Sequence, residues 1–156
     1  MGASRSATKA DEARRALDEG ATEVDMVANI GALIEGAADA VTEDISTVAE
    51  AVHRCRSDGI LKVILETRVL RKERIVLGCR CCVDGGADFV KTSTGFHPAG
   101  GADVEQVRLL CRHASPIPVK AAGGIRTAED VIAMLHAGAA RIGTSSGVAI
   151  VESLRR

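Results

Sequence analysis

Two lysines stand at the ends of short apolar segments of the chain. Lys91 ends the segment 89–91, and Lys120 ends the segment 117–120. At the carboxyl end of a strand in an α/β domain, a lysine can point into the mouth of the fold, where active sites collect, without burying its charge inside the sheet. Partial burial or a second nearby cation favours the neutral amine, which can attack a carbonyl and form a Schiff base. The two lysines therefore predict imine chemistry.

Further polar or small residues end the other segments that we predict to be strands. If the strands are parallel, one face of the sheet collects Asp25, Glu66, Lys91, Lys120 and Gly143. An imine-forming enzyme needs a neutral lysine, a second charge beside it and an acid/base that moves protons between intermediates. Lys91, Lys120 and Asp25 can fill these roles, and the pattern alone does not choose the nucleophile.

Lys62 is a further candidate for the site. Its alternation with Leu61 and Val63 could turn its side chain toward the same face as the strand-end residues. An ion pair at the rim with Glu66 or Asp25 is an equally good interpretation of this residue.

Alternating elements position these residues. Glycine and alanine recur where a helix passes into a short apolar strand, and the left-handed turn after a helix favours glycine there. These junctions and two further apolar runs predict five strands, within 20–25, 61–66, 86–91, 117–120 and 138–143. Helical spacing predicts helices over 6–19 and from Val41 to Val52. Capping pairs predict the starts of two more, at Asp103 with Gln106 and at Thr127 with Asp130.

Strands that alternate with helices are typical of parallel βαβ units. We therefore expect an α/β fold of one domain over residues 1–156, with five parallel βα units that belong to a partial TIM (β/α)₈ barrel. A complete barrel normally takes about 250 residues. Five units leave two sheet edges open, so we expect a truncated barrel or one that needs another copy to cover its edges.

Two glycine-rich loops give a second chemical signal. Gly123, Gly124 and Arg126 precede one predicted helix, and Gly143, Ser145 and Ser146 precede the last one. Glycines let backbone N–H groups approach an anion, and the loops after the last two strands of such barrels commonly bind phosphate. The loops predict a phosphorylated substrate, although Ser145 and Ser146 could equally be helix caps.

Composition excludes other classes of function. The net charge is −1, and two phenylalanines without tryptophan or tyrosine offer no stacking platform for bases, so we expect no nucleic-acid partner. The sequence has no apolar run that approaches the roughly 18 residues of a membrane span and no apolar signal core, so we expect a soluble, cytoplasmic protein. Five cysteines with CxxC spacing at Cys79 and Cys82 raise the possibility of zinc, but their helical context favours buried, reduced thiols and no metal.

At these residues the sequence resembles deoxyribose-phosphate aldolase, a class I aldolase on a TIM barrel. The resemblance covers nearly the whole chain and follows the order of that family's motifs. It rests on the blocks Glu23-Val24-Asp25-Met26-Val27, Leu61-Lys62-Val63-Ile64-Leu65-Glu66-Thr67, Phe89-Val90-Lys91-Thr92-Ser93-Thr94-Gly95, Val119-Lys120-Ala121-Ala122-Gly123-Gly124-Ile125-Arg126 and Ile142-Gly143-Thr144-Ser145-Ser146.

The resemblance implies reversible cleavage of 2-deoxy-D-ribose 5-phosphate into glyceraldehyde 3-phosphate and acetaldehyde, a lyase reaction of deoxyribonucleotide catabolism that uses no metal or organic cofactor. It implies that Lys91 carries the acetaldehyde as an enamine, with Lys120 as its neighbouring cation and Asp25 as the proton-transfer residue working with ordered water. It also implies a phosphate site around Gly95, Gly124, Arg126, Gly143, Ser145 and Ser146. Gly123 and Lys62 join the predicted substrate-binding residues.

The resemblance also shows a departure. Family members have roughly three more strands before the point where this chain begins, so the five strands correspond to the C-terminal part of the barrel. Two alternatives stay open: an aldolase fragment without catalysis that self-associates or pairs with another chain, and another phosphate-binding barrel aldolase or isomerase. We expect a sugar phosphate and an aldehyde as ligands, and a homo-oligomer is possible.

Overall fold

The structure is a computed structural model that describes residues 2–155. Its five strands form one parallel sheet in which every strand lies beside its neighbour in the sequence. The strands are β1 (Glu23–Val27), β2 (Ile60–Ile64), β3 (Phe89–Lys91), β4 (Val119–Ala122) and β5 (Arg141–Gly143). This sequential order is the order of strands in a TIM barrel, and it confirms the predicted fold of five parallel βα units.

Helices connect the strands and cover one side of the sheet. They are α1 (Ser6–Asp18), α2 (Ile30–Glu35), α3 (Ala38–Cys55), α4 (Lys72–Asp84), α5 (Val104–His113), α6 (Ala128–His136) and α7 (Gly147–Ser153), with a short 3₁₀ helix, η1 (Thr67–Val69), after β2. Two predicted caps are confirmed, because the Asp103 side chain accepts from the Gln106 N–H and Thr127 forms a capping box with Asp130. These caps fix where the chain leaves the sheet and enters α5 and α6.

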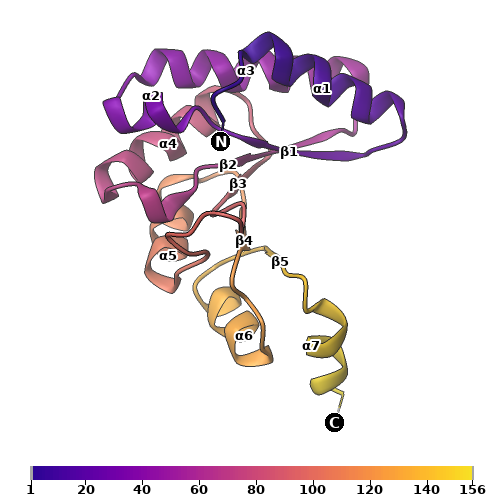
Figure 1. Cartoon of the computed structure of the whole chain (residues 1–156), viewed down its shortest axis with the longest axis vertical. Helices are drawn as coiled ribbons and strands as arrows, with labels where there is room; N and C mark the ends of the chain where they lie inside the picture. The colour runs from indigo at the N-terminus through magenta and orange to yellow at the C-terminus, as the bar shows by residue number, and fades with distance from the viewer. Residues whose placement is uncertain (1, 156) are drawn as a thin grey trace.

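The two faces of the sheet differ in chemistry because side chains alternate along each strand. One face packs against the helices with a continuous apolar core that includes Met26, Leu61, Val63, Val90, Val119 and Ala121. Figure 1 shows α1 to α6 along this convex side of the curved sheet. The alternating residues of the same strands point to the other, concave side, which these helices leave uncovered.

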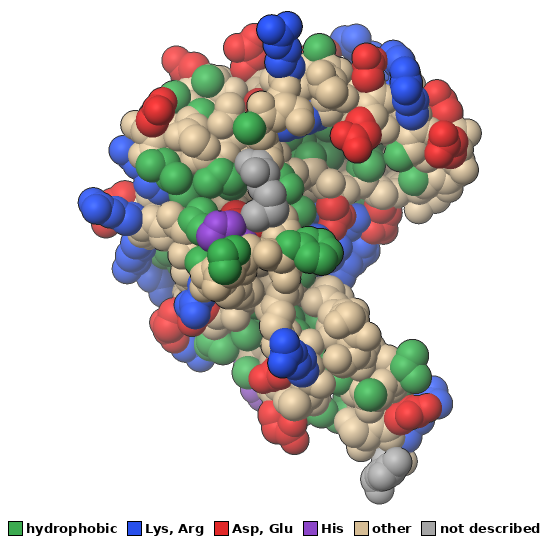
Figure 2. Space-filling view, in the orientation of Figure 1, with side chains coloured by type: hydrophobic (Ala, Val, Ile, Leu, Met, Phe, Trp, Pro, Cys, Tyr) green, Lys and Arg blue, Asp and Glu red, His purple; other side chains and the backbone are tan. Residues whose placement is uncertain are grey.

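The curvature of the sheet leaves a hollow on this concave side. In Figure 2 the hollow opens between the part of the molecule that carries α1 and the part that carries α7, and acidic and basic side chains are visible in it. Within residues 2–155, β1 and β5 each pair with a single strand and border the sheet. The described sheet is therefore an open part of a barrel wall.

Three of the five cysteines pack as small apolar residues in the helical layer. Cys79, Cys81 and Cys82 are buried in α4, as predicted, and burial raises the pKa of the Cys79 thiol to about 12. Among residues 2–155, the structure brings together no group of three histidine, cysteine, aspartate or glutamate side chains that could hold a metal ion. No helix in this range has the length and apolar composition to cross a membrane.

Candidate active site

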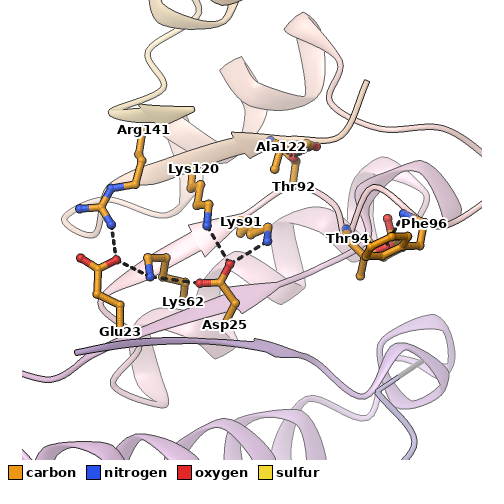
Figure 3. A network of polar contacts seen from close by, with 11 residues as sticks. Glu23, Asp25, Lys62, Lys91, Thr92, Thr94, Phe96, Lys120, Ala122 and Arg141 are labelled. Atoms are coloured by element: carbon orange, nitrogen blue, oxygen red, sulfur yellow. Dashed lines mark hydrogen bonds and ion pairs between the residues drawn. The ribbon is translucent and has the colours of Figure 1, made fainter. Parts of the chain in front are cut away.

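Asp25 stands at the centre of three ammonium groups on the concave face. Its Oδ2 accepts hydrogen bonds from Lys91 Nζ and from Lys120 Nζ, each at 2.7 Å. Its Oδ1 lies 3.0 Å from Lys62 Nζ. Figure 3 shows the four side chains converging from β1, β2, β3 and β4. The structure thus brings together the three predicted catalytic residues, together with Lys62.

Strand register explains this convergence. Asp25 is paired with Lys62 across β1 and β2, and Lys91 is paired with Lys120 across β3 and β4. Because side chains alternate along a strand, all four project from the same face of the sheet. Curvature of the sheet then turns β3 and β4 toward β1, so that one short carboxylate reaches lysines from three other strands.

The site is partly shielded from solvent, and this shapes its charge. The side chain of Lys62 is 3% exposed, and those of Lys91 and Lys120 are 11% and 15% exposed. Burial acts to raise the pKa of Asp25, but hydrogen bonds from Lys120, Lys91 and Lys62 outweigh it and hold that pKa well below its usual range. Asp25 is therefore a carboxylate at neutral pH, and the three cations around it favour that form.

For the pKa of Lys120, burial and nearby like charges outweigh the hydrogen bond to Asp25. Burial lowers the pKa of its ammonium, the hydrogen bond to Asp25 raises it, and the charges of Lys91 and Lys62 lower it further, with a net shift downward. The site therefore makes a neutral lysine amine easier to form than it is in water. A neutral amine is the form that a Schiff-base reaction requires.

A second carboxylate extends the network. Glu23 Oε2 lies 2.6 Å from Lys62 Nζ and also forms an ion pair with Arg141. The Arg141 guanidinium stands 4.8 Å from the centre of the Phe89 ring, a cation–π contact on the same face. Sequence reasoning missed Glu23 and Arg141, although each lies two residues before a predicted site residue and so projects from the same face.

The two interpretations of Lys62 now have an outcome. Its side chain turns to the face of the strand-end residues, as predicted, and its ion pair with Asp25 is confirmed. The predicted place at the rim is wrong because Lys62 is buried, and the predicted partner Glu66 is wrong because Glu23 takes that place. Its ammonium is held by two carboxylates, and its part in substrate binding stays a prediction.

Glu66 is a correction to the predicted site. It was expected to end β2 and face the lysines, but β2 ends at Ile64 and Glu66 adopts a left-handed backbone with φ 51°. This conformation turns its buried side chain to Thr94, in the loop after β3. Glu66 therefore lies outside the Asp25 cluster.

Three glycines pack backbone against backbone in the loops that follow β3 and β4. A Cβ on Gly101 would lie 2.2 Å from the carbonyl of Gly123, and a Cβ on Gly123 would lie 3.2 Å from the Cα of Gly95. The Ala102 N–H donates to the Gly123 carbonyl, which fastens the loop after β3 to the loop after β4. Gly124 has φ +75° and open space where a side chain would stand. Only glycine allows this approach of the two loops.

The last loop joins the same region. Gly143 lies against Lys120, because a Cβ there would be 3.2 Å from Lys120 Cε. The Thr144 hydroxyl donates to the Ile125 carbonyl and accepts from the Ser146 N–H. The structure thus links the loops that carry the predicted phosphate-binding residues.

Three further predicted phosphate-binding residues, Arg126, Ser145 and Ser146, lie in the loops after β4 and β5. Ser146 occupies the N-cap position of α7, but its side chain makes no capping hydrogen bond. Ser145 and Arg126 are exposed, and the Arg126 backbone N–H donates to Asp130. The cap interpretation of Ser146 is therefore not supported by its side-chain contacts.

Comparisons with known proteins agree with this architecture. Residues 2–153 match the family described as DeoC/LacD family aldolase. Proteins named deoxyribose-phosphate aldolase from Brevibacillus brevis and Thermococcus gammatolerans are 51% and 52% identical to the chain, over 99% of its length and 68% of theirs. The chain thus spans about two thirds of the length of these relatives.

Solved structures give the same result. The structure titled "QR15, an Aldolase" superposes with a TM-score of 0.89 and 42% identity, over 99% of this chain and 68% of that one. A deoxyribose phosphate aldolase from Aeropyrum pernix, described as tetrameric, superposes with a TM-score of 0.86 and 36% identity, over 99% and 64% of the two chains. By the match of its sequence over residues 2–153 and the likeness of its fold to solved relatives, this chain belongs to the DeoC/LacD family of aldolases.

Proposed function

We propose that the chain is a deoxyribose-phosphate aldolase that cleaves 2-deoxy-D-ribose 5-phosphate reversibly into glyceraldehyde 3-phosphate and acetaldehyde through a Schiff base on Lys91. The observation that carries the proposal is the pair of amines, Lys91 and Lys120, that share one oxygen of Asp25 at 2.7 Å each. Two relatives that are 51% and 52% identical to the chain are named deoxyribose-phosphate aldolase.

In the proposed reaction, the neutral amine of Lys91 attacks C1 of the open-chain sugar. Loss of water from the carbinolamine gives a protonated imine, which accepts the electron pair of the C2–C3 bond as that bond breaks. The C3 hydroxyl loses its proton, and glyceraldehyde 3-phosphate leaves. The remaining enamine gains a proton at C2, and water then hydrolyses the imine and releases acetaldehyde.

Asp25 and Lys120 serve the proton transfers of this scheme. Asp25 is the acceptor closest to both amines, so it can take the proton that leaves Lys91 and return it to a carbinolamine or an enamine. Lys120 shares one oxygen of Asp25 with Lys91, and in this scheme it is the neighbouring cation. Lys91 is chosen as nucleophile because residues 89–95 carry the motif of the family.

The phosphate group would lie over the glycine loops. Backbone N–H groups at Gly95, Gly123 and Gly124 can approach an anion closely because no side chain stands in the way. Ser145 and Ser146 would add hydroxyl donors, and Arg126 a charge, from the adjoining loops. The reaction itself needs no metal or organic cofactor, and we propose a cytoplasmic protein that works as a homo-oligomer.

Reduction of the imine tests this proposal. The purified chain is incubated with acetaldehyde and borohydride, and the adduct is located by intact mass and peptide mapping, with Lys91→Ala and Lys120→Ala in parallel. We expect one two-carbon adduct on Lys91, absent from Lys91→Ala. An adduct on Lys120 would refute the choice of nucleophile, and scattered or absent labelling would favour a fragment without catalysis.

Product analysis then separates the remaining alternatives. Release of acetaldehyde from 2-deoxyribose 5-phosphate, compared with release of aldehydes from other sugar phosphates, distinguishes this aldolase from a related one or an isomerase. Sedimentation over a range of concentrations shows whether the chain associates through its sheet edges.

A further inference from the structure

Glu66 combines two unusual features outside the lysine cluster. Among residues 2–155 it is the one residue other than glycine with a positive φ, at 51°. Its side chain is also buried, with 1% of the residue exposed. Left-handed backbone is unfavourable for a side chain with a Cβ, and a buried carboxylate is unfavourable unless it is well paired. Such a residue persists where the surroundings or the function require it.

The Glu66 carboxylate holds a turn in the loop after β3. Its Oε2 accepts from the Thr94 hydroxyl at 2.6 Å and from the Thr94 N–H at 3.2 Å. The same Thr94 hydroxyl accepts from the Phe96 N–H at 3.1 Å. Glu66 thus holds Thr94 directly and Phe96 through the Thr94 hydroxyl. These two residues flank Gly95, whose φ is +85°.

The backbone on either side of Glu66 is tied to the strand that carries Lys91. The Leu65 N–H donates to the Lys91 carbonyl at 3.0 Å, and the Thr67 N–H donates to the Thr92 carbonyl at 2.9 Å. These two bonds fix Glu66 opposite the loop after β3. In the described range, the donors to its side chain are the hydroxyl and the N–H of Thr94.

The second oxygen of the Glu66 carboxylate has no hydrogen-bond partner among residues 2–155. This atom, Oε1, is also buried. A glycine would relieve the strain of the left-handed backbone here, but it would leave the two Thr94 donors without this acceptor. A buried carboxylate with one oxygen bound to Thr94 and the other unpaired therefore points to a role in the shape of the loop at residues 94–96.

That loop lies beside the proposed phosphate site. Gly95 packs against Gly123, the first glycine of the loop after β4. Figure 3 shows Thr94 and Phe96 set apart from the lysines around Asp25. The turn at Gly95 can thus be changed without direct contact with the amines.

We propose that Glu66 is a positioning residue that fixes the turn at Gly95 and so aims its backbone N–H at the phosphate of the substrate. This proposal rests on the proposed function. It gives Glu66 a part in phosphate recognition but none in the imine chemistry, although Glu66 contacts neither the phosphate nor the lysine amines. Loss of the carboxylate should therefore weaken the binding of a phosphorylated sugar and spare the reaction of an unphosphorylated one.

Two pairs of variants test this assignment. Glu66→Gly keeps the left-handed backbone and removes the carboxylate, and Glu66→Gln restores an acceptor for Thr94. Thr94→Val removes the hydroxyl that the carboxylate binds, and Thr94→Ser restores it. Each is assayed with 2-deoxyribose 5-phosphate and with 2-deoxyribose.

We expect Glu66→Gly and Thr94→Val to lower kcat/KM for the phosphorylated sugar by about tenfold or more, through KM. The reason is that the Gly95 N–H would no longer be aimed at the charged phosphate, and the hydrogen bond between them would be lost. For 2-deoxyribose the change should stay within about twofold, the rate effect of a few tenths of a kcal/mol. Glu66→Gln and Thr94→Ser should recover most of the loss. Equal losses on both sugars, or no loss on either, would overturn the proposal.

A binding measurement keeps the proposal separate from the proposed function. Inorganic phosphate is added, and hydrogen exchange of the amides at 94–96 and 123–124 is followed in the wild type and in Glu66→Gly and Thr94→Val. We expect phosphate to protect these amides in the wild type and not in the two variants, even if neither sugar is cleaved. Equal protection in all three proteins, or none in the wild type, would refute the role of Glu66.

Discussion

Arg141 on β5 forms an ion pair with Glu23 on β1, so the two outermost strands of the described sheet are joined across its concave face. The same oxygen of Glu23 lies 2.6 Å from Lys62 Nζ on β2. Lys62 in turn contacts Asp25, the acceptor of the two candidate catalytic amines. Curvature of the sheet and the charge of the site are thus linked through one carboxylate.

The pair between Glu23 and Arg141 should contribute measurably to stability. Both side chains are about one third exposed, so we expect a coupling free energy of about 0.5–1 kcal/mol from the cycle of Glu23→Gln, Arg141→Gln and the double variant. Urea unfolding at low and high salt measures it, and salt should reduce it. The exposed pair Glu105 and Arg108 on α5 is the control, with a smaller coupling expected. Equal couplings for the two pairs would contradict this view.

Asp25→Asn should nearly abolish activity. The amide keeps the size of the side chain but loses the charge that holds Lys62, Lys91 and Lys120. We expect a loss of about 10²- to 10⁴-fold in kcat, as for other proton-transfer residues. Steady-state release of acetaldehyde measures it, and Asp11→Asn on the exposed face of α1 is the control. A variant with more than about a tenth of wild-type kcat would exclude Asp25 from proton transfer.

The stability contribution of Asp25 should depend on pH in a defined direction. Its pKa is lowered in the folded chain from an ordinary 3.8, so its contribution is complete above the ordinary value and is lost as the pH falls below it. The difference in unfolding free energy between wild type and Asp25→Asn should be constant from about pH 5 to 8 and shrink toward pH 3. Urea unfolding across this range measures it. A difference that grows on acidification would contradict the assigned shift.

Lys120 should give a slope of the same sign as Asp25, but in a more alkaline range of pH. Its pKa is lowered in the folded chain from an ordinary 10.5, so the unfolded chain binds more protons between the lowered value and 10.5. The stability of the wild type relative to Lys120→Met should therefore rise with pH in that window. Lys120→Arg keeps its charge throughout and should show no such rise relative to Lys120→Met. Unfolding at pH 7, 8.5 and 10 tests this, and a flat wild-type difference would be inconsistent with the shift.

Gly143→Ala should disturb the site without changing its charges. The added methyl would lie 3.0 Å from Ala122 Cβ and 3.2 Å from Lys120 Cε, so the lysine side chain must move. We expect kcat to fall by about tenfold, since small displacements of reacting groups are costly. Gly147→Ala is a matched control, because its methyl would meet only Thr144, at 3.9 Å. If Gly143→Ala kept full activity, Lys120 would not need its observed position.

The sequence was sufficient for the local features of the fold. Capping pairs such as Asp103 with Gln106 lie three residues apart, so their hydrogen bonds follow from local geometry. The helix over Val41 to Val52 followed from spacing alone. Parallel order followed from the alternation of elements, which allows few other arrangements.

The partners within the site could not be predicted in this way. Glu23 and Arg141 are 118 residues apart and meet only because the sheet curves. Glu66 was misplaced because a glutamate after an apolar strand gives no sign of a left-handed backbone, which depends on the donors that Thr94 offers. Alternation could have found Glu23, since it shares a strand face with Asp25.

The concave face also carries a charge opposite to that of the whole chain. The chain has a net charge of −1, whereas on this face four cations, Lys62, Lys91, Lys120 and Arg141, surround two carboxylates, Glu23 and Asp25. A hollow of excess positive charge in an acidic molecule concentrates field lines and attracts anions from solution. Capture of a phosphorylated ligand should therefore slow as salt is added, while that of a neutral aldehyde should not.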